Sequence, residues 1–206
     1  MAERTEADRE PADLSPGRRL RADAERNRTR LLDAARSAFA SGQSSVPLDQ
    51  IARDADVGIG TLYRHFPTRE ALVEALYRKE LDDLCASAAA LLATRSPQRA
   101  LRAWMDRFAD YVAAKREMAD ALRAVYASGA VSVSQARGRL TAAVQVILDA
   151  GISDGTLRAD VRAEDVVAMT VGMFTATPSI EGGREQLERM FGLLLDAVRR
   201  PGTSGG

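Results

Sequence analysis

The sequence predicts an all-α protein of about nine helices, and three observations support this fold class. Apolar residues recur with a period of about 3.6 along most of the chain. The period-2 alternation of half-buried strands is absent from the sequence. Clusters of Gly, Pro and Ser divide the periodic stretches into segments of helix length. With 46% hydrophobic and 28% charged residues among 206, the composition is that of a globular protein.

The N-terminal third contains three predicted helices. The first covers residues 24–40, and its apolar face carries Leu31, Leu32, Ala35 and Phe39. Ser41 and Gly42 end it. Two short amphipathic helices follow over residues 48–55 and 59–66, joined by a tight turn at residues 56–58.

A long helix and several shorter ones form the rest of the predicted fold. Thr68 is a good N-cap for a helix that reaches about Ala93. Pro97 suits the first position of the next helix, because a helix start does not need its missing N–H. The remaining apolar patterns predict helices over residues 97–115, 117–127, 132–150, 163–176 and 184–199, with a break at residues 151–155.

These segments divide the chain into four parts. Residues 1–22 mix acids and arginines without apolar periodicity, which predicts a flexible arm. Residues 23–68 form a helix-turn-helix domain and residues 69–200 a larger C-terminal helical domain. Residues 201–206, rich in Gly, form a disordered tail.

The chain lacks the residues that most enzyme and metal sites need. It has one cysteine, Cys85, and one histidine, His65, so we expect no disulfide, no metal site and no cofactor. We expect Cys85 to be a small buried side chain, with redox sensing as the weaker alternative. The adjacent acids at residues 82–83 and 164–165 diverge around a helix axis, so they do not form a catalytic pair. The sequence therefore predicts a protein that is not an enzyme.

The sequence also indicates where the protein acts. No apolar run reaches the ~18–20 residues of a membrane span. The first ten residues carry acids where a secretory signal has an apolar core. We therefore expect a cytoplasmic protein without membrane contact.

The two short helices have the pattern of a helix-turn-helix, and the second presents residues suited to DNA. Ile59, Gly60 and Thr61 are expected at base edges, since Gly60 allows a close backbone approach and Thr61 offers a hydroxyl and a methyl group. Longer donors suit phosphate oxygens, and these are Tyr63, Arg64, His65 and Arg69. The alternative is an αα-corner of a helical bundle in which Tyr63 is half-buried core.

This segment resembles a known family. The motif Ile51-Ala…Val57-Gly-Ile-Gly-Thr-Leu-Tyr-Arg-His-Phe66, followed by Arg69-Glu-Ala-Leu72, is similar to the signature of TetR-family transcriptional regulators. The resemblance implies a homodimer whose N-terminal helices bind a palindromic operator in double-stranded DNA. It also implies a C-terminal domain that binds a small-molecule effector, of unknown identity here. The match is strong over residues 24–78.

A cluster of aromatic and methionine side chains marks a candidate ligand pocket in the C-terminal domain. The resemblance implies a cavity among these helices, and its expected lining is Trp104, Phe108, Tyr111, Met118, Tyr126, Met169, Met173 and Phe174. The alternative is that this stripe is simply core. Lys115, Arg116 and Arg123 offer positive charge to an anionic ligand, or they are solvated.

The last two predicted helices are apolar on more than one face. The resemblance implies that they form a four-helix bundle with a second protomer, with C2 symmetry. The residues expected in this interface are Val167, Val171, Met190, Phe191, Leu194, Leu195 and Val198.

The function predicted from these features is that of a DNA-binding repressor which a small-molecule ligand releases from its operator. A ligand-dependent activator and a helical interaction protein on the same scaffold are the alternatives. The formal net charge of zero hides an uneven distribution, because residues 1–16 carry two arginines and five acids whereas residues 17–80 carry 12 basic and nine acidic residues. This modest excess indicates few phosphate contacts and a dependence on dimerisation for affinity.

Overall fold

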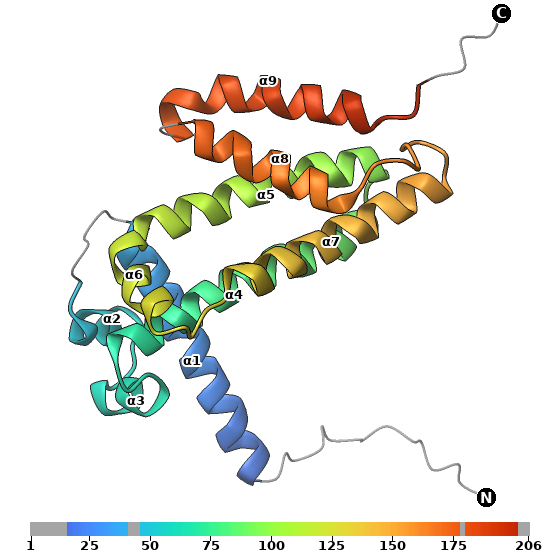
Figure 1. The fold of residues 1–206 in the computed structure, drawn as a ribbon. Helices are drawn as coiled ribbons and strands as arrows, with labels where there is room; N and C mark the ends of the chain where they lie inside the picture. The colour runs from blue at the N-terminus through green and yellow to red at the C-terminus, as the bar shows by residue number, and fades with distance from the viewer. Residues whose placement is uncertain (1–15, 41–45, 178–179, 202–206) are drawn as a thin grey trace, which may run out of the picture.

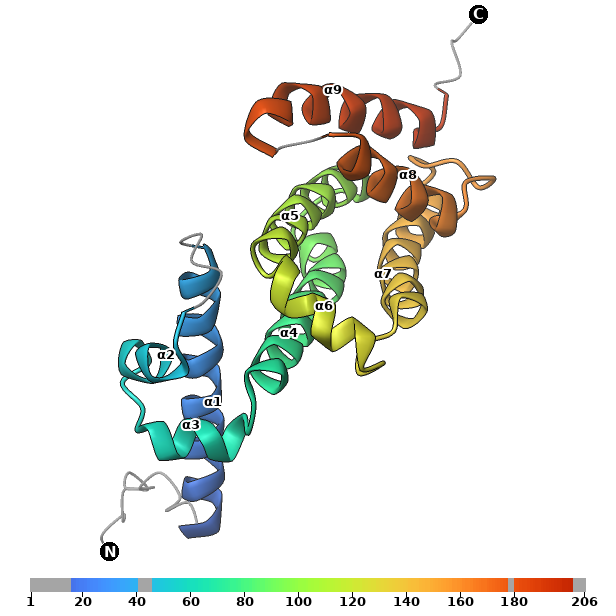
Figure 2. The same ribbon diagram turned by 60° about the vertical axis from the view of Figure 1, so that its left-hand side comes forward.

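The computed structural model describes residues 16–40, 46–177 and 180–201 of the chain. Within these ranges it contains nine α-helices and no β-strand, apart from one isolated bridge between Leu157 and Arg199. The prediction of an all-α fold is confirmed. Helices α1–α3 lie together at one end, and α8 and α9 lie at the other (Figures 1 and 2). None of the helices in the described ranges is long and apolar enough to cross a membrane.

The N-terminal bundle consists of α1 (Pro16–Ala40), α2 (Leu48–Asp54) and α3 (Ile59–His65). Its core contains the predicted apolar face of α1 together with Ile51, Leu62 and Phe66, all of which are buried. In the turn between α2 and α3, Asp56 has the positive φ of 50°, whereas Gly58 caps α3 at φ −61°. Asp tolerates the left-handed region better than most residues, so this turn does not need its glycine for conformation.

Helix α1 begins earlier than the sequence predicts. The flexible arm expected over residues 1–22 is wrong for residues 16–22, which are helical, and residues 1–15 lie outside the described part. Pro16 occupies the first helical position, where proline is tolerated, and the residues after Gly17 include the good helix formers Leu20 and Arg21. In Figures 1 and 2 the first turns of α1 extend past α3.

Helix α4 (Arg69–Leu92) joins the two parts of the molecule. It begins as predicted, because the Thr68 hydroxyl accepts a hydrogen bond from the Ala71 N–H at 3.1 Å. Its buried residues run along most of its length, so it packs against the N-terminal bundle at one end and the C-terminal domain at the other. A displacement of α4 would therefore change the packing of both the N-terminal bundle and the C-terminal domain.

The C-terminal domain adds α5 (Pro97–Glu117), α6 (Ala119–Ala127), α7 (Val133–Ser153), α8 (Ala163–Ala176) and α9 (Ile180–Val198). Helices α5, α6 and α7 pack against α4, whereas α8 packs on α7 and α9 packs on α5 and α8. The expected break at residues 151–155 comes later than predicted. Gly151 lies inside α7, where an added Cβ would overlap the side chain of Leu157. Gly155, at φ 75°, follows the end of the helix instead. Of the predicted tail, only Pro201 lies within the described residues.

Candidate nucleic-acid interface and ligand pocket

Helix α3 presents a solvent-exposed face at the end of the molecule farthest from α9. Leu62 is fully buried and anchors the helix, so the residues around it point outward. Ile59 is 43% exposed and Tyr63 is 50% exposed, so both side chains are available for contact with a partner. Gly60 has open space where a Cβ would stand, and Thr61 is half-buried beside it. Contact between this face and a DNA groove stays a prediction.

The basic residues expected at phosphates have different surroundings. Arg64 is exposed on the last turn of α3, and His65 is half-buried, with its ring centroid 6.1 Å from that of Phe66. Arg69 lies at the start of α4 and points into the protein. Its guanidinium donates a hydrogen bond to the Val46 carbonyl at 2.5 Å and lies 5.4 Å from the centroid of the Phe39 ring.

These contacts give Arg69 a structural role that sequence reasoning missed. It fastens α4 to the segment before α2 and covers the end of the α1 core. A phosphate contact from Arg69 remains a prediction, whereas Ile59, Gly60, Thr61, Tyr63 and Arg64 share one short helix and its exposed surface.

Replacement of Arg69 tests its structural role. We expect Arg69→Ala to lower the free energy of unfolding by about 1–3 kcal/mol, since a part-buried carbonyl loses a charged donor. The exposed Arg64→Ala is the matched control and should change stability by less than about 0.5 kcal/mol. Urea denaturation of both variants measures this, and equal stability of Arg69→Ala and wild type would contradict the structural role.

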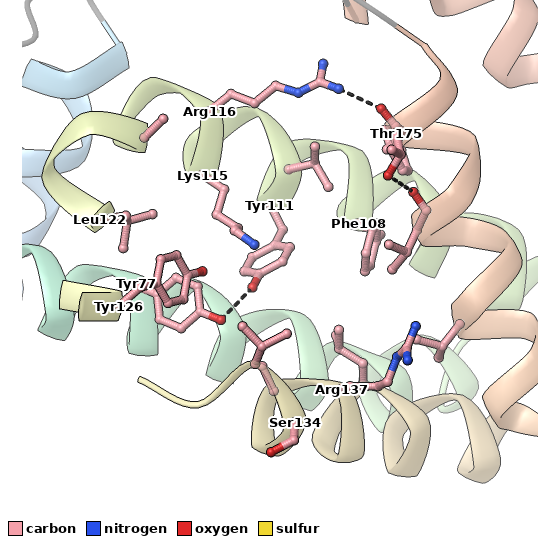
Figure 3. A pocket seen from close by; sticks show the side chains of 18 of the residues that line it. Tyr77, Phe108, Tyr111, Lys115, Arg116, Leu122, Tyr126, Ser134, Arg137 and Thr175 are labelled. Carbon is pink, nitrogen blue, oxygen red and sulfur yellow. Dashed lines mark hydrogen bonds between the residues drawn. The ribbon is translucent and has the colours of Figure 1, made fainter. Parts of the chain in front are cut away.

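A cavity of about 920 Å³ lies between α4, α5, α6, α7 and α8 (Figure 3). Four of the eight residues expected to line it do so, namely Phe108, Tyr111, Tyr126 and Phe174. The structure assigns further lining residues that the sequence prediction missed as pocket residues, among them Tyr77, Leu122, Ser134, Arg137 and Leu140. Tyr77 lies on α4, which the sequence prediction did not place at the pocket.

The other four expected pocket residues do not line this cavity. Trp104 is fully buried and packs against Phe108 at a centroid distance of 5.6 Å, behind the pocket wall. Met118 and Met173 are core residues outside the lining. Met169 is 49% exposed on the outer side of α8. Helical spacing alone did not separate the inward, outward and pocket-facing sides of these helices.

Two tyrosines at one end of the pocket form a hydrogen-bonded pair. The Tyr111 hydroxyl donates to the Tyr77 hydroxyl at 3.2 Å, and the two rings are tilted against each other. Burial raises the pKa of Tyr77 to about 12 and also raises the pKa of Tyr111. Both hydroxyls therefore keep their protons at neutral pH and add no negative charge to the pocket.

The residues expected in a dimer interface divide into two groups. Val167, Phe191, Leu194 and Val198 are buried within the protomer, so these four are not on its outer surface. Val171 is partly buried and lines the pocket. Met190 and Leu195 are partly buried against the core. The exposed apolar side chains of the last two helices are instead Met169 and Leu193, the latter 71% exposed.

A buried carboxylate connects the N-terminal bundle to α4. Glu80 of α4 is 7% exposed, and its Oε1 lies 3.3 Å from Nε of Arg36 on α1. Burial raises the pKa of Glu80, and the positive charges of Arg36 and Lys79 oppose that rise. The pair lies one helical turn beyond Tyr77, so the same part of α4 contacts both α1 and the pocket.

The raised pKa of Glu80 predicts a pH dependence of stability. A carboxyl whose folded pKa lies above its unfolded value contributes stability that is fully present below the unfolded pKa and is lost as pH rises through the folded pKa. Glu80→Gln lacks this titration. The unfolding free energy of Glu80→Gln minus that of wild type should therefore increase between about pH 4 and pH 7. Urea titrations at both pH values test this, and a pH-independent difference would contradict it.

Comparison with known proteins identifies the family. Residues 31–76 match the model of bacterial regulatory proteins of the tetR family, and residues 96–200 match the C-terminal domain of SbtR-like transcriptional regulators. An HTH-type transcriptional regulator of Staphylococcus aureus is 34% identical over 64 residues, which are 31% of this chain and 35% of the relative. The chain thus matches only about a third of the length of its curated relatives.

Solved structures match over nearly the whole fold. The TetR transcriptional regulator SCO0520 of Streptomyces coelicolor is 45% identical, with a TM-score of 0.74 over 84% of this chain and 98% of its own. A TetR regulatory protein of Mycobacterium vanbaalenii is 34% identical, with a TM-score of 0.69 over 88% of this chain and 99% of its own. The chain therefore belongs to the TetR family of transcriptional regulators.

Proposed function

We propose that this protein is a sequence-specific DNA-binding repressor, active as a homodimer on a palindromic operator, which a small-molecule effector releases from DNA. The observation that carries the proposal is the continuity of α3 with α4. The exposed face of α3 is followed, after a three-residue connection, by a helix that lines the pocket. Membership of the TetR family supports the same reading.

The DNA contacts follow from the exposed face of α3. Thr61 and its neighbours Ile59 and Gly60 contact base edges, and Tyr63 and Arg64 contact phosphates. The first turns of α1 add exposed arginines, including Arg18 and Arg21, that follow the DNA backbone.

Dimerisation uses the outer faces of α8 and α9. Met169 and Leu193 are the large apolar side chains exposed there in the described residues. Exposed Ala168, Gly172 and Ala197 are small and permit close helix approach. In Figure 2 this pair of helices lies at the end of the protomer opposite the N-terminal bundle, so a C2 contact there leaves both α3 helices free for DNA.

Effector binding acts on DNA affinity through α4. An effector in the pocket contacts Tyr77, and three residues later Glu80 holds Arg36 of α1. A shift of α4 therefore moves the N-terminal bundle and changes the separation of the two α3 helices. Because both half-sites must be engaged together, an effector that prefers the unsuitable spacing draws the protein away from DNA.

Selection of genomic fragments from the source organism tests this function. The purified protein should enrich fragments that share an inverted repeat, whereas Thr61→Ala should enrich them less or select a relaxed sequence at the contacted base. Binding that is independent of sequence, or absent even at low salt, would contradict the proposal and favour a helical interaction protein. Binding that requires an added effector would contradict release by the effector and would favour a regulator whose effector promotes DNA binding.

A further inference from the structure

The lining of the pocket between α4 and α8 is one-sided in charge. Of the described residues that line it, four are basic and none is acidic, and the basic ones are Lys115, Arg116, Arg123 and Arg137. The remaining lining is apolar, aromatic or hydroxyl-bearing. A cavity with this surface disfavours a cation and favours a ligand that carries negative charge.

Two of these basic side chains already interact with other groups of the protomer. Arg116 donates to the carbonyl oxygens of Phe174 at 2.7 Å and Thr177 at 3.2 Å, where it stabilises the C-terminal end of α8. Arg123 pairs with Asp120 at 3.3 Å, and both side chains are largely exposed. These two arginines therefore contribute little to the recognition of a ligand.

Lys115 is placed differently. Its ammonium group lies 5.7 Å from the centroid of the Tyr126 ring, and it forms no ion pair within the described residues. Figure 3 shows Lys115 gathered with Tyr126, Tyr111 and Tyr77 at one end of the pocket, whereas Arg137 lies toward the other end. At the tyrosine end of the pocket, the Lys115 ammonium group thus lies over an aromatic ring and is not paired with a carboxylate of the described residues.

The hydroxyl of Tyr126 is a second, independent indication of a ligand position in the pocket. Its buried oxygen lies near the Tyr77 hydroxyl but makes no well-aligned hydrogen bond among the described residues, whereas the Tyr77 and Tyr111 hydroxyls bond to each other. A buried hydroxyl without a partner is costly, so such a group in a cavity wall indicates a position for a ligand atom. The hydroxyl and the Lys115 ammonium group together are the donors that a carboxylate accepts from.

The rest of the pocket is suited to an aromatic body. Phe108 and Phe174 have ring centroids 5.5 Å apart, and Leu140 and Val167 add apolar surface beside them. At about 920 Å³ the cavity is large enough for a drug-sized molecule.

From this arrangement we infer that the effector is an aromatic carboxylic acid, whose carboxylate is bound by Nζ of Lys115 and the hydroxyl of Tyr126 and whose body packs against Phe108 and Phe174. The inference rests on the proposed function, because it assumes that this cavity is the effector site. It adds the charge and the chemical class of the effector, and the residues that select for them.

A matched pair of fluorescent probes tests the inference. Pyrenebutyrate carries a carboxylate, and pyrenebutanol has the same body without the charge. The chain has a single tryptophan, Trp104, which packs against the pocket residue Phe108, so quenching of its emission by energy transfer reports binding of either probe. We expect the wild type to bind pyrenebutyrate at least about tenfold more tightly than pyrenebutanol.

Three variants assign the preference to its residues. Lys115→Met and Tyr126→Phe should each weaken pyrenebutyrate binding about fivefold to tenfold and leave pyrenebutanol binding within about twofold. Unchanged alcohol binding shows that each variant is folded with an intact cavity. Arg107→Met, on the outer side of the same helix as Lys115, removes a charge away from the pocket and should affect neither probe.

The outcomes separate this inference from the proposed function. Equal affinity of the wild type for both probes, or a Lys115→Met variant that loses both equally, overturns the assignment of an anionic effector and leaves the cavity as a ligand site. Failure of the wild type to bind either probe overturns the inference and also counts against the cavity as the effector site. Operator binding by α3 is measured separately and is unaffected by either outcome.

Discussion

Leu193→Glu is expected to convert the protein from a dimer to a monomer and to lower operator affinity by more than about 100-fold. Leu193 is 71% exposed in the protomer, so the substitution costs little in the monomer itself. In a C2 interface the substitution occurs twice across the same axis, which places two buried carboxylates in an apolar contact. A monomer engages only one half-site and loses the roughly 100-fold or greater gain of bivalent binding.

Sedimentation at micromolar concentration and operator titration measure the two effects on the same sample. Val146→Glu is the matched control, because Val146 is also an exposed apolar residue but lies on α7. It should remain dimeric and bind the operator as the wild type does. A Leu193→Glu variant that stays dimeric would show that α8 and α9 do not form the interface.

The second large effect is expected from the removal of one hydroxyl group on α3. Tyr63→Phe deletes a hydrogen bond to a phosphate in each protomer, and a bond to a charged group is worth about 1.5–3 kcal/mol. Two such losses per dimer total about 3–6 kcal/mol and predict a decrease in operator affinity of at least about 100-fold. Because Tyr63 is half exposed, the melting temperature should stay unchanged.

Fluorescence anisotropy with a labelled operator measures this loss. Tyr126→Phe is the matched control, since it removes a hydroxyl from the pocket and leaves the surface of α3 intact. In the absence of effector it should bind the operator with wild-type affinity. An equal loss in both variants would indicate a general effect of the substitutions, and no loss in Tyr63→Phe would remove Tyr63 from the phosphate contacts.

The helices could be predicted from the sequence because their stabilising features are local. Apolar period, the Thr68 cap and Pro97 at a first position act within one or two turns, and the structure places helices α2, α3, α5 and α8 within a few residues of the predicted ranges. Gly151 was misread as a break because its role depends on Leu157, six residues later, which packs against it. The helical start at Pro16 was missed because its composition resembles that of a loop.

The faces of the C-terminal helices could not be assigned from the sequence alone. Trp104 and Phe108 lie one turn apart on α5, yet one is fully buried behind the wall and the other lines the pocket. Met169 and Met173 differ in the same way on α8, where one is exposed and the other buried. The period of the apolar residues shows how wide the apolar face of a helix is. Which neighbouring element each part of that face contacts depends on tertiary packing. The internal role of Arg69 likewise depends on Val46, 23 residues earlier.

Two α3 helices, one from each protomer, are proposed to contact the DNA together. The most direct test is the stoichiometry and footprint of the protein on the operator obtained by genomic selection. We expect two protomers on one inverted repeat whose half-site centres lie about 10 base pairs, or a multiple of that, apart, with protection lost in Tyr63→Phe. A single protomer on an unrepeated site, or a footprint that Tyr63→Phe leaves unchanged, would contradict it.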